Sequence, residues 1–298
     1  MANLKEVRER ITSVKNTQQI TKAMKMVSAA KLRRAQQAIT QMRPYANKLN
    51  EILKNILSNL DGDVASSFGD AREVNKVCMV VVTSNRGLCG GFNTNIIKAA
   101  SRKINEAYLA QLEAGNLDII FIGKKGYDGM KKVFPQANMN TEYLELFNDL
   151  SFDHVAAVSQ MLMDKFEQQS YDKIDVAYAS FKNAAVQEHV CVQFLPVEKI
   201  EADENETSGH KADYIFEPSM GELLEHLVPS ILQTTFQKFL LDTHASEHGA
   251  RMTAMDNATE NAQELLQDLK ISYNKARQEA ITKELSEIVG GAAALESA

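Results

Sequence analysis

Apolar or small side chains recur at alternating steps of three and four in two runs within the first 60 residues, and the more polar stretch between the runs changes register through Ile20, Met24 and Val27. This heptad spacing places them on one seam of a helix and predicts packing against another helix. At 1.5 Å per residue, a helix of about 57 residues would be about 85 Å long, too long to lie within one globule. The seam positions are Leu4, Val7, Ile11, Val14, Leu32, Ala35, Ile39, Met42, Ala46, Leu49, Leu53, Ile56 and Leu60.

The C-terminal segment shows the same period from Leu241 to Ala280, and its phase then moves to Ile281 and Leu285. Many of its seam positions are Ala, Thr or Met, and small residues allow another helix to approach closely. Because proline disrupts a helix interior, Pro229 predicts a kink or a helix start. We expect the two terminal helices to form an antiparallel coiled coil within the chain.

The middle of the chain alternates between short apolar runs and amphipathic stretches. This rhythm is typical of parallel strands linked by helices, and it predicts a small Rossmann-like α/β domain inserted between the terminal helices. The expected strands are 76–84, 117–123, 174–182 and 186–197, the last two adjacent, and the expected helices are 93–114 and 153–169.

Charge divides the 298 residues in the same way. The chain carries 33 basic and 39 acidic side chains, a net charge of −6. Residues 1–60 contribute +9, residues 61–217 contribute −9 and residues 218–298 contribute −6. We therefore expect an N-terminal coiled-coil helix, an α/β domain and a C-terminal coiled-coil helix with these bounds, the two helices being complementary in charge.

Composition excludes several classes of protein. With 44% hydrophobic residues, 14 Gly and 5 Pro, the chain is neither disordered nor collagen-like. No apolar run approaches the roughly 20 residues that a membrane span needs. The three cysteines form no disulfide framework and no CxxC pair, which favours a reducing compartment.

The strongest local motif is TSNRGLCGGFN at 83–93, which directly follows an apolar strand. A Gly-rich turn from strand to helix can cradle a phosphate, so a nucleotide-binding α/β enzyme using Gly87–Gly91 is one hypothesis. The glycines do not match GxGxxG, and GKKG at 123–126 lacks the Walker spacing. A tight turn with close packing is the favoured interpretation, with Cys89 an ordinary buried thiol.

Two further patterns suggest functions that we weigh lower. His244, Glu247 and His248 match the HxxEH pattern of inverted zinc peptidases, but they lie inside the heptad series and lack an identifiable third ligand. The basic N-terminal helix suggests nucleic-acid binding, but acidic residues predominate in the rest of the chain. We expect no metal, no nucleic acid and no cofactor.

Four blocks in this order carry a family resemblance over essentially the whole chain. They are MANLKEVRERITSVKNTQQITKAMKMVSAAKLRRAQ at 1–36, TSNRGLCGGFN at 83–93, ASEHGARMTAMDNATENA at 245–262 and YNKARQEAITKELSEIVGGAAAL at 273–295. The chain resembles the gamma subunit of the bacterial F-type rotary ATP synthase.

The resemblance implies the central rotor stalk of the proton-translocating enzyme, a non-catalytic subunit. It implies three alpha and three beta subunits, the epsilon subunit and the c ring as partners, with the membrane contacted only through the c ring. Catalysis would take place at the alpha–beta interfaces. The implied location is the cytoplasmic face of the bacterial inner membrane, and because the motif alignment begins at Met1, we expect no transit peptide.

The resemblance also implies roles for particular residues. The implied coupling contacts between rotor and stator are Met24, Arg251, Arg277, Gln278, Thr282 and Glu284. A foot facing the c ring is implied by the weaker match of Tyr214, Phe216 and Glu217 in DYIFEP. For Thr282 and Glu284, a solvated helix face or simple coiled-coil packing is an equal alternative. No cysteine occurs in 196–213, so thiol control of the chloroplast kind is not expected.

Overall fold

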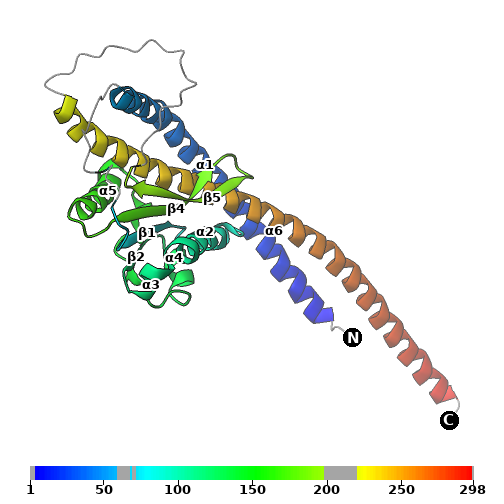
Figure 1. Cartoon of the computed structure of the whole chain (residues 1–298). Helices are drawn as coiled ribbons and strands as arrows, with labels where there is room; N and C mark the ends of the chain where they lie inside the picture. Colours follow the sequence, from blue (N-terminus) through cyan, green and yellow to red (C-terminus); the bar gives the residue numbers. More distant parts are fainter. Residues whose placement is uncertain (1–3, 59–67, 69–71, 198–219, 297–298) are drawn as a thin grey trace. The chain divides into compact units, whose positions relative to one another are not determined.

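The computed structural model describes residues 4–58, 68, 72–197 and 220–296. The chain forms two compact units, one from residues 1–28 with 252–298 and one from residues 29–251. Two long helices, α1 (Leu4–Ser58) and α6 (Met220–Glu296), contribute to both units (Figure 1).

The larger unit is built on a five-stranded sheet. Its strands are β1 (Val77–Val82), β2 (Leu117–Ile122), β3 (Asn138–Asn140), β4 (Lys173–Phe181) and β5 (Gln187–Leu195), and their order in the sheet is β3-β2-β1-β4-β5. Strands β1 to β4 run parallel, and β5 pairs antiparallel with β4. All four predicted strands are confirmed, including the adjacent pair.

Helices cover both faces of this sheet (Figure 1). Alternate side chains of β1 enter different cores. Cys78 and Val80 pack with α5 (Phe152–Glu167) and α6, whereas Met79 and Val81 pack with α2 (Phe92–Ala107) and α4 (Lys124–Met130). Because both faces are covered, every residue of β1 is buried and the strand is a continuous apolar run. The remaining elements are α3 (Leu109–Glu113) and the 3₁₀ turn η1 (Leu146–Asn148).

The structure corrects the sequence predictions in two helices. The helix expected over 93–114 is interrupted at Tyr108, whose backbone leaves the helical region and whose hydroxyl donates to buried Asp175 at 2.6 Å. A helix start at Pro229 is wrong, because α6 runs through that residue. Proline removes one helix hydrogen bond, but Val228 and Ile231 beside it are buried in the core, and this packing retains the helix.

The smaller unit is an antiparallel coiled coil of the first part of α1 and the last part of α6. Cross-helix hydrogen bonds join Arg8 to Tyr273, Gln18 to Gln263 and Thr21 to Thr259, and Lys25 pairs with Asp256. In these pairs the residue number on α6 falls as the residue number on α1 rises, which confirms the antiparallel arrangement. Predicted seam residues are buried here: Val7, Met255, Ala262, Leu266 and Leu269.

Past the contact between Arg8 and Tyr273, the α6 side chains become exposed. From Arg277 onwards the described α6 side chains are exposed, including the large apolar residues Ile281, Leu285, Ile288 and Val289. Within the described residues, no helix contains a stretch apolar and long enough to cross a membrane.

Candidate functional site

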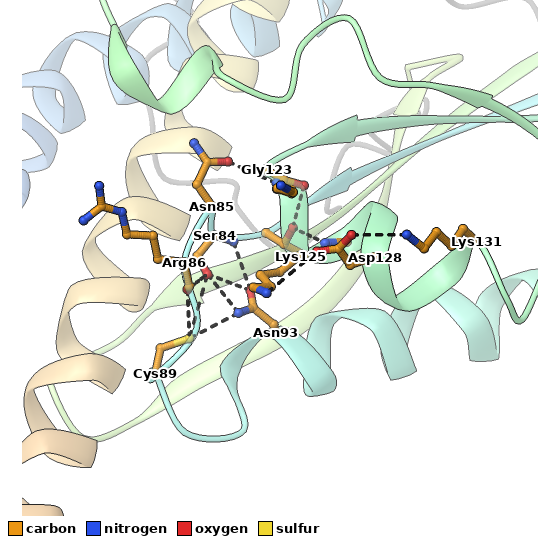
Figure 2. Close-up of polar contacts among 12 residues, drawn as sticks. Ser84, Asn85, Arg86, Cys89, Asn93, Gly123, Lys125, Asp128 and Lys131 are labelled. Atoms are coloured by element: carbon orange, nitrogen blue, oxygen red, sulfur yellow. Dashed lines mark hydrogen bonds and ion pairs between the residues drawn. The ribbon is translucent and has the colours of Figure 1, made fainter.

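The Gly-rich turn after β1 is held together by its own side chains (Figure 2). Asn93 accepts the backbone N–H of Ser84 at 3.0 Å, and the Ser84 hydroxyl donates to the carbonyl of Arg86 at 2.7 Å. Asn93 also donates to the buried Cys89 sulfur at 3.2 Å. The turn needs left-handed backbone at Leu88 (φ 64°) and Gly90 (φ 59°), and it leaves the Leu88 side chain 66% exposed.

A second turn, at the GKKG segment, is joined to the first. Gly126 N–H donates to the Thr83 hydroxyl at 2.8 Å, and Lys124 N–H donates to the Asn85 side chain at 3.0 Å. Gly123 has φ 96°, and a Cβ there would lie 1.9 Å from the Thr83 carbonyl oxygen. Glycine is therefore required by close approach of the backbones. The positive φ of Gly90 and the close approach at Gly123 thus give one glycine of each motif a structural reason.

Arg251 of α6 fastens the Gly-rich turn to the helix. Its Nη2 donates to the carbonyl oxygens of Arg86 and Gly87 at 3.0 and 3.3 Å, and its Nη1 donates to Glu247 at 2.5 Å. Arg251 and Glu247 lie one helical turn apart, and both side chains are only 10% exposed. Burial raises the pKa of Glu247, and the Arg251 charge opposes that effect. The guanidinium thus satisfies two backbone carbonyls and one buried carboxylate at once.

The HxxEH segment lies in the same cluster. The Nε2 atoms of His244 and His248 are 3.0 Å apart, and the His244 ring stacks on Phe147. Burial, helped by the charges of Lys31 and Arg251, lowers the pKa of His244 to about 4. Burial, helped by His244, also lowers the pKa of His248, to about 3. Both rings are therefore neutral at pH 7.

These contacts give the motif a structural role. Glu247, which would be the general base of a zinc peptidase, is paired with Arg251. In the part of the chain that the structure describes, no three His, Cys, Asp or Glu side chains are grouped as metal ligands would be.

The residues implied as coupling contacts lie in different surroundings. Met24 is half-buried on α1, beside Lys25, and Arg251 is buried against the turn of its own chain. Arg277, Gln278, Thr282 and Glu284 are exposed on α6, and Thr282 donates to the Gln278 carbonyl at 2.9 Å. The predicted foot residues Tyr214, Phe216 and Glu217 lie outside the described residues.

Sequence reasoning missed several partners of these residues. The ion pair between Glu247 and Arg251 could have been predicted, because the two residues are four positions apart, the spacing at which opposite charges pair on a helix. The opposite charges of the two terminal helices predict ion pairs between them, but they do not predict the register that pairs Lys25 with Asp256. No local sequence pattern indicates that the backbone carbonyls of Arg86 and Gly87 accept hydrogen bonds from Arg251.

A family model described as ATP synthase matches residues 3–295. The chain is 52% identical over 295 residues to the ATP synthase gamma chain of Christiangramia forsetii and 53% identical over 296 residues to that of Flavobacterium psychrophilum. Each alignment covers 99% of both chains.

Solved structures are similar in fold. A chain in the Euglena gracilis mitochondrial ATP synthase (OSCP, F1 and c ring) aligns with a TM-score of 0.68 at 24% identity, covering 99% of this chain and 95% of that one. A chain of the rotor of the same organism's enzyme aligns with a TM-score of 0.59 at 23% identity, covering 93% and 98%. Together with the whole-length relatives and the matching family model, the coiled coil and inserted sheet lead to one assignment: the chain belongs to the ATP synthase gamma chain family.

Proposed function

We propose that this chain is the central rotor stalk of a proton-translocating F-type ATP synthase. The observation that carries the proposal is the coiled coil of α1 and α6, in a chain that matches gamma-chain relatives over its whole length. Rotation of such a shaft would present different faces to three catalytic sites in turn. It would thereby couple distant sites through changes of conformation rather than through chemistry of its own.

The exposed end of α6 supports this role. Ile281, Leu285 and Ile288 are between 53% and 70% exposed, and they share one helix face at steps of four and three. An apolar face of this kind is suited to a surrounding sleeve of other subunits. We propose the alpha and beta subunits, three of each, as that sleeve.

The polar residues near this face are proposed coupling contacts. Arg277, Gln278 and Thr282 are exposed and can donate hydrogen bonds to acidic loops and release them as the shaft turns, whereas the exposed Glu284 carboxylate can only accept hydrogen bonds from donors. Met24 is proposed to act at the beta subunits' moving loops. Arg251 is proposed to contribute by holding the Arg86–Gly87 backbone in place.

We further propose that residues 61–217 form an α/β domain between the helical segments 1–60 and 218–298. The epsilon subunit and the c ring would bind on the side of this domain. Tyr214, Phe216 and Glu217 would form the foot facing the ring. The complex would lie at the cytoplasmic face of a bacterial inner membrane, and the chain would contact the membrane only through the c ring.

Reconstitution tests this proposal. The full chain is mixed with alpha and beta subunits, and composition and ATPase activity are measured with and without it. One copy of this chain per complex of three alpha and three beta subunits, with increased ATPase activity, is expected. Stoichiometric tight binding of ATP or a dinucleotide by the isolated chain in equilibrium dialysis would instead favour the nucleotide-binding enzyme.

A further inference from the structure

A polar pocket of about 370 Å³ lies at the amino ends of the parallel strands. Lys76 and Asn116 immediately precede β1 and β2, and Asn138 begins β3. Ligand sites in open α/β sheets ordinarily lie at the carboxyl ends of the strands, where the Gly-rich turn follows β1. The pocket is therefore separate from the candidate site described above.

Asp118 is the only carboxylate among the described residues that line the pocket, and its oxygens are already engaged by neutral donors. The Tyr171 hydroxyl donates to Oδ2 at 2.8 Å, and the Asn138 amide donates to Oδ1 at 2.9 Å. Burial, the neighbouring Cys78 and the bond to Asp118 raise the pKa of Tyr171, so the phenol remains a donor. Both oxygens of Asp118 thus accept hydrogen bonds from uncharged donors and not from a lysine of the pocket.

Two ammonium groups complete the lining. The backbone of Lys76 is fixed by Asp172, whose carboxylate accepts the Lys76 N–H at 2.8 Å and whose own N–H donates to the Lys76 carbonyl at 2.8 Å. Lys165, near the end of α5, lies over the Tyr171 ring with Nζ 5.4 Å from the centroid. Within the described part of the chain, neither ammonium lies within ion-pair distance of a carboxylate. The pocket therefore has two cations against one carboxylate.

We infer that this pocket binds a small phosphate-bearing anion through Lys76 and Lys165. Lysine binds phosphate oxygens as a point charge, and the Asn116 and Asn138 amides and Ser170 supply hydrogen-bonding groups beside it. The volume falls within the range of small-molecule sites, which begins at about 300 Å³. The inference does not depend on the proposed rotor function, because it uses contacts of this chain alone.

Titration calorimetry on the full chain tests the site, with inorganic phosphate as the probe in a low-salt chloride buffer. Saturable binding with one site per chain is expected. Because a charge-assisted hydrogen bond is lost in each variant, K76Q and K165Q should each weaken binding roughly tenfold. D118N should strengthen binding, since it removes the repelling charge. No loss of folding can produce that opposite sign.

Lys98→Gln is the matched control, because it removes one lysine of α2 that lies outside the pocket. It should leave the affinity unchanged, and K76R should retain binding if K76Q fails to fold. Repeating the titration with ribose 5-phosphate distinguishes a phosphate ester from the free ion as the preferred form. Absence of saturable binding, or an equal loss in K98Q, would overturn the inference.

Discussion

Arg251 donates from Nη2 to the carbonyl oxygen of Arg86 at 3.0 Å, joining positions 165 residues apart in the chain. The contact fastens a turn at the end of a buried strand to a long helix. The same guanidinium pairs with Glu247, so one side chain donates hydrogen bonds both to a carboxylate of its own helix and to a carbonyl of the turn. Loss of this side chain would therefore leave a buried carboxylate without its counter-charge and the turn without its link to α6.

Replacing Arg251 with Gln should lower the free energy of unfolding by about 3–5 kcal/mol. Glu247 would then be buried without its counter-charge, which is the costly way to break a buried pair. Urea denaturation of the full chain measures the effect. The double variant E247Q/R251Q should recover part of the loss, and an equal or larger loss in the double variant would contradict this explanation.

Acid should destabilise the larger unit through His244 and His248. Their folded-state pKa values, about 4 and about 3, lie below the ordinary 6.5, so the unfolded chain binds more protons between these limits. The stability that they contribute is present above pH 6.5 and is lost as the pH falls towards 4. The expected slope is about 1.4 kcal/mol per pH unit for each histidine. Denaturation from pH 7 to pH 4 should show a shallower dependence in H244Q/H248Q than in the parent chain.

Two glycine substitutions should differ sharply although both lie in the joined turns. Gly123→Ala places a Cβ 1.9 Å from the Thr83 carbonyl oxygen at positive φ, so a loss of at least about 2 kcal/mol is expected. A Cβ at Gly87 meets nothing within 4 Å, and Gly87→Ala should change stability by less than about 1 kcal/mol. Thermal unfolding of both variants measures the contrast. Similar losses would show that close approach of the Thr83 backbone is not what requires glycine at 123.

Lys25 and Asp256 should contribute little to the coiled coil despite their 2.5 Å contact. Their side chains are 40% and 43% exposed, and solvent-exposed pairs are worth about 0.2–1 kcal/mol. A double-mutant cycle with K25A and D256A gives the coupling energy, which should decrease as salt rises. A coupling energy above about 2 kcal/mol that resists salt would mean that the pair is effectively buried.

Polar substitution on the exposed end of α6 should separate assembly from folding. L285S and I288S remove apolar side chains that are 61% and 70% exposed, so unfolding of the isolated chain should shift by less than about 0.5 kcal/mol. If the alpha and beta subunits cover this face, the same variants should weaken reconstitution or ATPase stimulation. Exposed Val133→Ser on the α/β unit is the control. Unchanged assembly in L285S and I288S would contradict the proposed sleeve.

The periodic elements could be predicted from the amino-acid sequence, because their signals are local. Heptad spacing predicted both long helices, and the apolar run at 76–84 predicted a buried strand. The three-residue β3 and the seven-residue α4 were missed, since neither is long enough to show a period. The family motifs named the coupling residues Met24, Arg251 and Arg277, and those roles stay predictions.

Other features depend on contacts between residues that are distant in sequence, which local patterns do not indicate. Tyr108 ends α2 with its hydroxyl on Asp175, and α6 continues through Pro229 because its neighbours are buried. Arg251 likewise reaches the carbonyls of a turn that is distant in sequence. In each case the deciding free energy comes from burial and hydrogen bonding between separate elements. A pattern of neighbouring residues reports propensity and period, but it carries no information about which distant groups will meet.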